Sequence, residues 1–251
     1  MIDRREMLIG SLATFASYAL LREMRAAAAE LPSTLSATRW VARQEELARA
    51  LAHGTISQAA WHDGIGSLAR SLDVAQLVAE IGRARQRDAG PPFGHDPQKR
   101  FVTILAPDSS PRRLSYAAAL FVFTPDSVIT PHAHLHMASA HMVIEGKVRI
   151  RTFDRVADES GAIVIRPATD RIATTGDTAA MTAAKDNVHW FAPRSHRAVT
   201  FDVIIDGLDP GPRRYVIQPL DVLGGERRND GTIRAPLLSF AQSSECYGAA
   251  L

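Results

Sequence analysis

The sequence predicts a mostly β domain, a sandwich or a barrel, that follows a small N-terminal helical segment. Three observations favour this fold class. Apolar residues recur at helical spacing between residues 36 and 86. Beyond about residue 96, short apolar or alternating runs follow one another, separated by Gly, Pro, Asp and Asn. Strands do not alternate with helices in this second part, which argues against a parallel α/β sheet.

Composition limits the classes of protein that the chain can be. It has 251 residues, of which 46% are hydrophobic and 22% are charged, enough for one full core or one domain with an appendage. The formal net charge is only +2, with basic and acidic residues interspersed, so nucleic acid is not an expected partner. Cys246 is the single cysteine, which excludes an internal disulfide and a metal site built on cysteines.

Residues 1–29 have the pattern of an export signal. Arg4 and Arg5 precede an uncharged run over residues 8–21, and four alanines end at Ala29. This order is typical of a cleavable signal, and the arginine pair resembles the twin-arginine type. We therefore expect a bacterial periplasmic protein with no stable membrane span after cleavage, or a membrane-anchored one if the signal stays uncut. An ordinary amphipathic helix is the alternative.

Residues 30–95 are predicted to form the helical segment. Trp40, Leu47 and Leu51 share one face of a first helix. Asp73 is a suitable N-cap for a further amphipathic helix. Two histidines within residues 36–86, His53 and His62, are predicted to be surface or packing residues rather than ligands.

Residues 96–222 are predicted to form the β domain. The stretch "KVRIRTF" at residues 147–153 alternates strictly between its two faces, as a half-buried strand does. The stretch "AGPPFGHDPQKR" at residues 89–100, rich in Pro and Gly, is predicted to be a linker between the helical and β parts. Residues 223–251 are polar and contain glycines, and are expected to form a wrapping or loose tail.

Four of the nine histidines fall within ten residues: His132, His134, His136 and His141. Because side chains alternate along a strand, His132 and His134 project to the same side and can bind one ion together. His189, in another β segment, is the candidate for a third ligand. Imidazole suits zinc, iron, copper and nickel. Three neutral ligands would leave the charge of the ion uncompensated and several coordination positions open.

This pattern resembles the first motif of the cupin superfamily, which consists of His-x-His, a Glu position and a Gly at fixed spacing. Gly146 follows His134 by twelve residues, and Ser139 stands at the Glu position. The stretch "DNVHWFAPRSHRAVTFDVI" resembles the second motif and contains His189 and Asp202. The resemblance implies a double-stranded β-helix, a jelly-roll-like barrel, over residues 96–222.

With Ser139 in place of Glu, the set is His132, His134 and His189, which resembles the thiol dioxygenase branch of the cupins, closest to the plant cysteine oxidase and aminoethanethiol dioxygenase family. This implies a non-haem Fe(II) site that adds dioxygen to a small thiol and yields a sulfinate. Zn, Mn and Ni stay open as the metal. The implied partners are a small-molecule thiol and dioxygen, and a homodimer is a further expectation from the superfamily.

The same resemblance implies roles for further residues. Asp202, His141 and Ser139 are expected to take part in catalysis or to support the ligands, and Arg100 is expected to bind a substrate carboxylate. Whether His136 joins the site is left open. Three alternatives remain: another metal-dependent cupin enzyme (an isomerase, a decarboxylase or a non-thiol dioxygenase), a non-catalytic periplasmic module that binds a metal or ligand, and a degenerate cupin.

Overall fold

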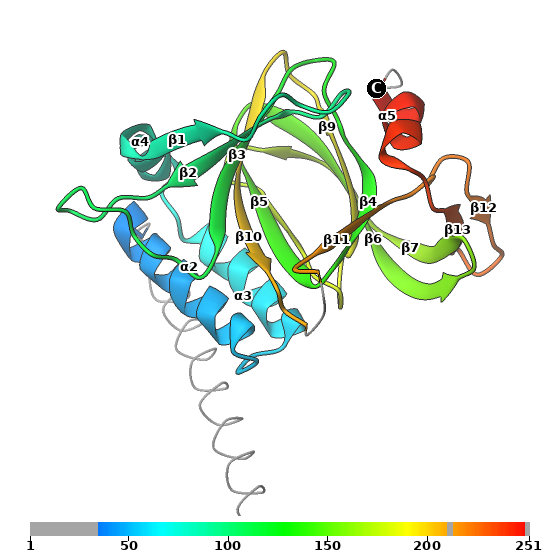
Figure 1. Cartoon of the computed structure of the whole chain (residues 1–251), viewed down its shortest axis with the longest axis horizontal. Coiled ribbons are helices and arrows are strands. Elements are labelled where there is room, and N and C mark those ends of the chain that lie inside the picture. Colours follow the sequence, from blue (N-terminus) through cyan, green and yellow to red (C-terminus); the bar gives the residue numbers. More distant parts are fainter. Residues whose placement is uncertain (1–34, 210–212, 249–251) are drawn as a thin grey trace, which may run out of the picture.

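The computed structural model of the chain describes residues 35–209 and 213–248. Three helices come first, two antiparallel sheets follow, and a fourth helix lies near the end of the chain (Figure 1). The predicted export signal at residues 1–29 lies outside the described residues. In the described part of the chain, no helix combines the length and the apolar character that a membrane crossing requires.

The sheets contain six and seven strands. The helices are α2 (Ala37–Ala52), α3 (Gln58–Arg70), α4 (Val74–Arg83) and α5 (Phe240–Gly248). The six-stranded sheet has the order β1 (Arg85–Asp88), β2 (Gln98–Thr103), β3 (Ala117–Phe123), β10 (Ala198–Asp206), β5 (Met137–Glu145) and β8 (Thr178–Met181). The seven-stranded sheet has the order β11 (Val216–Pro219), β4 (Ile129–Leu135), β9 (Val188–Pro193), β6 (Lys147–Glu159), β7 (Ala162–Thr174), β13 (Ile233–Pro236) and β12 (Glu226–Arg227).

The eight strands from β3 to β10 form a jelly roll. Numbered one to eight along the chain, they lie in the order 1-8-3-6 in one sheet and 2-7-4-5 in the other. This order of two interleaved Greek keys is the double-stranded β-helix of cupin-type barrels. The predicted fold class, a mostly β barrel behind a small helical segment, is confirmed.

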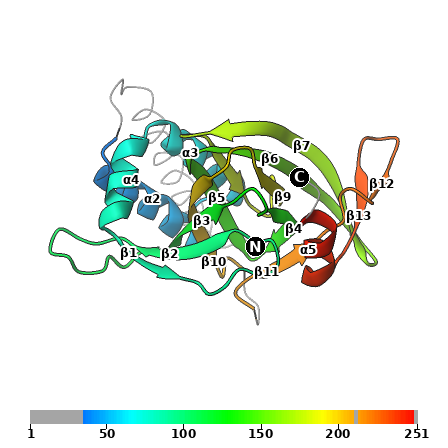
Figure 2. The ribbon, with the colours of Figure 1, turned by 90° about the horizontal axis from the view of Figure 1, so that it is seen from above.

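The helices cover the outer face of the six-stranded sheet. Trp40, Trp61 and Leu77, one from each of α2, α3 and α4, are fully buried. They belong to one apolar cluster with Val102 of β2 and Phe201 of β10. Figures 1 and 2 show these helices on one side of the barrel and α5 on the other. The helical segment is therefore part of the same folded unit as the barrel.

The helical segment is shorter than the sequence predicted. Asp73 caps α4 as expected, because its Oδ1 accepts hydrogen bonds from the backbone N–H groups of Ala75 and Gln76 at 3.0 and 3.2 Å. The helix ends at Arg83, however, and Arg85–Asp88 form the edge strand β1. These four residues are exposed and have little β propensity of their own, so pairing with β2 makes them a strand.

The C-terminal segment is an ordered wrap around the barrel. Strand β13 pairs with β7, and Ser243 of α5 donates a hydrogen bond to the Thr130 hydroxyl on β4 at 2.8 Å. Tyr247 is fully buried, with its ring edge-on to Trp190. Of the two possibilities raised for this segment, wrapping and looseness, the described residues show wrapping.

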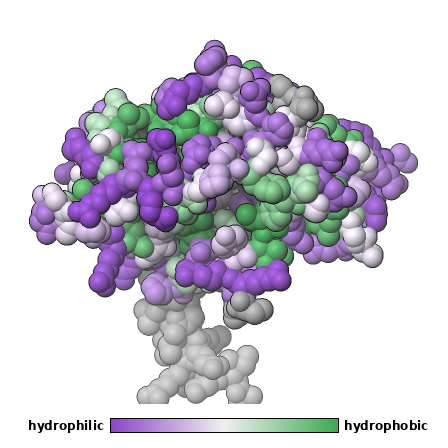
Figure 3. Space-filling view, turned by 45° about the horizontal axis from the view of Figure 1, so that its top comes forward, coloured by the Kyte–Doolittle hydropathy of each residue, from purple (hydrophilic) through white to green (hydrophobic). Residues whose placement is uncertain are grey.

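The surface is mostly polar on the face shown in Figure 3, where apolar side chains form patches between polar ones. Eight large apolar side chains among the described residues are exposed. Two of them, Phe93 and Phe240, lie near each other at one end of the barrel, because both line the same cavity.

Gly146, between β5 and β6, provides a test of the barrel's packing. It has φ +74°, and a Cβ there would overlap the carbonyl oxygen of Arg197. Gly161 has a similar φ of +68° but open space around it. We predict that Gly161→Ala lowers the free energy of unfolding by about 1–2 kcal/mol, the cost of the left-handed conformation. Gly146→Ala should cost about 1–3 kcal/mol more because of overpacking.

The measurement is urea-induced unfolding of both variants beside the unchanged protein. Equal losses for the two alanine variants would mean that the close approach of Gly146 to Arg197 does not constrain the turn.

Candidate metal centre

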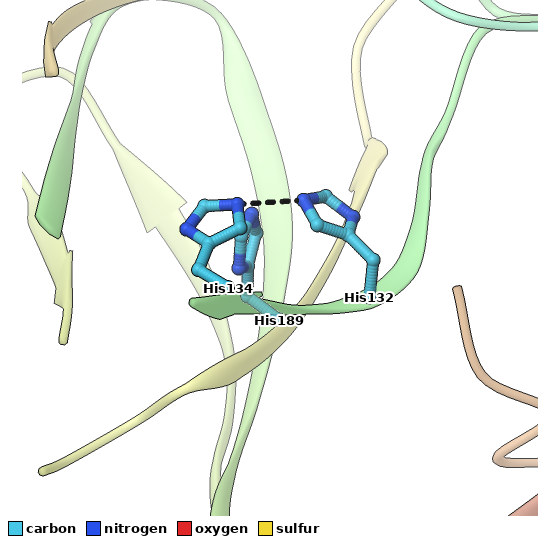
Figure 4. A group of neighbouring side chains, drawn as sticks. All are labelled: His132, His134 and His189. Carbon is cyan, nitrogen blue, oxygen red and sulfur yellow. Dashed lines mark hydrogen bonds between the residues drawn. The ribbon is translucent and has the colours of Figure 1, made fainter. Parts of the chain in front are cut away.

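Three histidine side chains converge inside the barrel from two paired strands. His132 and His134 lie on β4, and His189 lies on β9 directly opposite His132 in the antiparallel ladder. Their ring nitrogens offer ligand atoms that all lie within 4.8 Å of one another. Figure 4 shows the three rings facing a common point. The structure thus brings together the three histidines that the sequence predicted as ligands.

The hydrogen bonds of His132 leave its inner nitrogen free for a metal. Its Nδ1 lies 2.7 Å from the carbonyl oxygen of Thr130, and because a carbonyl only accepts, Nδ1 carries the proton. Nε2 therefore has a lone pair, and it lies 3.0 Å from Nε2 of His134. Two nitrogens at right angles around an ion, with bonds of about 2.1 Å, would be about 3 Å apart. The residues present fit a metal ion.

Burial keeps these imidazoles neutral. The pKa of His132 is lowered to about 4, mainly by loss of hydration and to a smaller extent by neighbouring His141, against the opposing effect of the Thr130 carbonyl. Burial also lowers the pKa values of His134 and His189 well below the ordinary value, again with a contribution from the neighbouring imidazoles. Neutral imidazole is the form that binds metals, so protons compete weakly for these nitrogens near pH 7.

A second pair of polar side chains enters from the opposite sheet. His141 on β5 and Asp202 on β10 are direct partners in the ladder, and His141 Nδ1 contacts Asp202 Oδ2. Asp202 is fully buried, and its Oδ1 accepts a hydrogen bond from Thr200 Oγ1 at 2.8 Å. The ring centre of His141 lies 5.6 Å from that of His189. Asp202 is thus engaged by His141 and Thr200 and is not a member of the three-residue group that could hold a metal.

Ser139 lies in the same cavity lining as the three histidines, and its hydroxyl is a weaker metal ligand than the carboxylate of a Glu would be. Its hydroxyl is buried and has no hydrogen-bond partner among the described residues, and it lines the cavity. His136, whose participation was left open, has φ +63° and places its Nδ1 3.2 Å from Asp209 Oδ2, away from the cavity lining.

His53 and His62 lie outside the centre, as predicted. His53 is exposed just after α2, and His62 places its Nε2 3.0 Å from Asp186 Oδ2. Neither belongs to the group that could hold a metal.

The expectation for Arg100 needs correction. Arg100 is exposed and donates from Nε to Asp88 Oδ1 at 2.9 Å, outside the cavity lining. Its neighbour Lys99 lines the cavity instead. The reason is strand alternation on β2. Val102, two residues after Arg100, packs in the cluster beneath the helices, so Arg100 points to that side of the sheet and Lys99 to the other. Alternation along β2 allows only one of these two neighbouring cations to reach the cavity, and the structure shows that it is Lys99.

The histidines lie in a cavity of about 360 Å³, the size of a small-molecule site. His141, Asp202 and Lys99 line it beside the metal centre. Residues 89–93, 96 and 97 of the predicted linker, together with Phe240 of α5, complete its wall. The linker and the C-terminal segment therefore both contribute to the site, which their composition did not reveal.

The fold and the site together define the class: a cupin-type jelly roll with three convergent histidines that could hold a metal ion. No family model matches the chain, and no curated protein matches its sequence.

Solved structures similar to the chain include a vicilin from Capsicum annuum, at a TM-score of 0.36 and 13% identity over 53% of this chain and 34% of that one. The chain therefore spans about a third of the vicilin's length. KdgF from Halomonas sp. has a TM-score of 0.32 and 16% identity, over 49% of this chain and 86% of that one. An oxalate oxidase has a TM-score of 0.31 and 18% identity, over 41% of this chain and 45% of that one. These values say nothing about the chemistry of the site.

We predict that the metal-free protein loses stability as the pH falls from about 6.5 toward 4. His132, His134 and His189 have lowered pKa values, so below pH 6.5 these residues bind more protons in the unfolded chain than in the folded one. Above pH 6.5 the three imidazoles are neutral in both states and add no pH dependence, whereas below it they destabilise the fold by about 1.4 kcal/mol per pH unit for each residue.

Urea unfolding of chelator-treated protein at pH 7, 6 and 5 measures this dependence. His132→Gln should make the slope shallower, whereas His53→Gln, at an exposed position, should leave it unchanged. A stability that stays level from pH 7 to pH 5 would contradict the assignment of these histidines as neutral.

Proposed function

We propose that the chain is a non-haem Fe(II) enzyme that adds dioxygen to a small thiol and releases a sulfinate. The observation that carries this proposal is the convergent three-histidine set, in which His134 and His189 are buried and His132 is half-buried, with Ser139 at the position where a carboxylate would join it. Three neutral ligands leave the charge of the ion to attract an anionic thiolate. Bound there, Fe(II) would lower the thiol pKa and bring the thiolate and dioxygen into reaction.

The overall reaction balances without a further reductant. A thiolate and one dioxygen molecule combine to a sulfinate: two sulfur–oxygen bonds form, the oxygen–oxygen bond breaks, and sulfur supplies the four electrons. When the thiol becomes a thiolate it releases one proton, and a group of the protein has to accept that proton. His141 lines the cavity and is held by Asp202, so its imidazole is our candidate for that proton.

A second candidate function is a proton-transfer reaction on an anionic substrate, such as isomerisation, at the same metal centre. The buried His141–Asp202 pair favours it, because a histidine oriented by a carboxylate serves acid–base chemistry without any oxidant. In that case a redox-inert metal would support activity as well as iron does. A module that merely stores a metal would use neither His141 nor the cavity.

We predict that the protein loaded with Fe(II) without oxygen takes up dioxygen when a thiol is added. Cysteine, cysteamine, 3-mercaptopropionate and an N-terminal-Cys peptide should be offered in turn, and the active thiol should yield one sulfinate per dioxygen. His189→Ala should lose both iron and uptake because one of three ligands is gone. His53→Ala, which changes an exposed histidine, should keep both.

Oxygen electrode traces, sulfinate by mass spectrometry and bound iron by metal analysis measure the three quantities. Tight iron binding with no uptake for any of the thiols would reject thiol oxidation. The metal centre would then belong to the second candidate, and substitution of Zn(II) for Fe(II) would be the next comparison.

We further propose that the chain is exported after folding, on the strength of Arg4, Arg5 and the short apolar run behind them. In a bacterial host, the full chain should appear in the periplasmic fraction, and Arg4→Lys with Arg5→Lys should retain it in the cytoplasm. Arg22→Lys with Arg25→Lys is the matched control, since it makes the same change behind the apolar run. Equal export of both variants would exclude the twin-arginine route.

A further inference from the structure

Lys99 is an unpaired cation inside the cavity. It is the one lysine or arginine in the lining over residues 35–209 and 213–248, and it forms no ion pair with a described carboxylate. Its Nζ lies 5.0 and 5.2 Å from the ring centres of Phe101 and Phe121. Burial lowers the pKa of Lys99, against the opposing effect of Asp202, because its ammonium group has lost part of its water. A partly dehydrated ammonium without a carboxylate partner favours an anionic ligand.

The cavity carries an excess of positive charge once a metal is bound. Two carboxylates line it. Asp202 is held by His141 and Thr200, and Asp96 lies at the exposed rim, where burial still raises its pKa. The ammonium of Lys99 and a divalent ion together outweigh these two charges. An anionic group on the substrate, in addition to any atom that meets the metal, would offset the remainder.

The mouth of the cavity presents two exposed phenyl rings. Phe93 is 54% exposed in the segment between β1 and β2, and Phe240 is 55% exposed at the start of α5. The two segments are packed tightly together, because a Cβ on Gly94 would overlap the Ser244 hydroxyl and one on Gly248 would overlap the His95 ring. The rings therefore stand on a fixed frame, and apolar surface left exposed in this way favours an apolar ligand group.

We infer that this site takes an amphiphilic anion, with a carboxylate or similar group at Lys99 and an aryl or alkyl group between Phe93 and Phe240. The inference rests on the proposed function for the metal step, and it names the substrate class of the same site. A free three-carbon thiol would leave the mouth unused, whereas a cavity of about 360 Å³ accommodates a larger molecule.

Three probes without a thiol test this substrate class: 3-phenylpropionate, propionate and 3-phenylpropan-1-amine. Calorimetric titration of the Fe(II)-loaded protein without oxygen, and of the metal-free protein, gives their dissociation constants. We expect 3-phenylpropionate to bind about tenfold or more tightly than propionate, since it adds a ring to bury. The amine should show no measurable binding.

Four variants assign the contacts, with one matched control. Lys99→Met should weaken both carboxylates about tenfold or more, and Lys99→Arg should restore most of the affinity. Phe93→Ala and Phe240→Ala should weaken 3-phenylpropionate several-fold and leave propionate unchanged. Arg100→Met, next to Lys99 but outside the cavity, should change nothing. Thermal melting verifies that each variant is folded.

Equal binding of the amine and the carboxylate, or an unchanged affinity in Lys99→Met, would overturn the anionic part. An unchanged preference for the phenyl probe in both phenylalanine variants would overturn the apolar part. Because no probe contains a thiol, these results are independent of oxygen uptake. Selective probe binding without thiol oxidation would reject the proposed function alone, and thiol oxidation without probe selectivity would reject this inference alone.

Discussion

The register between β4 and β9 places His132 opposite His189, and the metal centre depends on it. A slip of one residue would turn the ligands of one strand out of the barrel. Two contacts oppose such a slip. The buried side chain of Asn187, two residues before His189, donates to the carbonyl oxygen of His134 at 2.8 Å. On its other side β9 pairs with β6, where His189 lies opposite Thr152. The strand that supplies the third ligand is therefore held from both sides.

This arrangement has an energetic cost, because ring nitrogens are buried at the site without hydrogen-bond partners. His134 Nδ1 and His189 Nδ1 are buried and have no hydrogen-bond partner among the described residues. Next to the site lies an apolar cluster within the barrel, which includes Phe123, Ile150 and Phe191. Such surroundings disfavour charged imidazole and strengthen the attraction between a cation and its ligands. The same burial that weakens the metal-free protein in acid thus prepares the site to bind a metal.

Local periodicity accounts for what could be predicted from the sequence. Alternation with period two places His132 and His134 on one side of a strand, and the spacing to Gly146 marks the turn that ends the next strand. The misplaced residues depend on pairings between distant segments. Arg100 and Lys99 are equally plausible until the inward face of β2 is known, and Arg85–Asp88 form a strand only because β2 offers an edge. The sequence does not show that residues 89–97 and α5 line the cavity, because this depends on how both segments pack beside β4.

Different parts of this chain supply the residues that could hold a metal and the residues at the mouth of the cavity. The jelly-roll strands supply all three histidines and the His141–Asp202 pair, whereas the exposed rings at the mouth come from a connecting segment and from α5. These parts are nevertheless coupled: Ser243 of α5 donates to the hydroxyl of Thr130, whose carbonyl orients His132. A ligand that displaced α5 would therefore also loosen a metal ligand. On the proposal that the cavity takes an amphiphilic anion, Phe93 and Phe240 would set the preference among substrates while α5 stays in place.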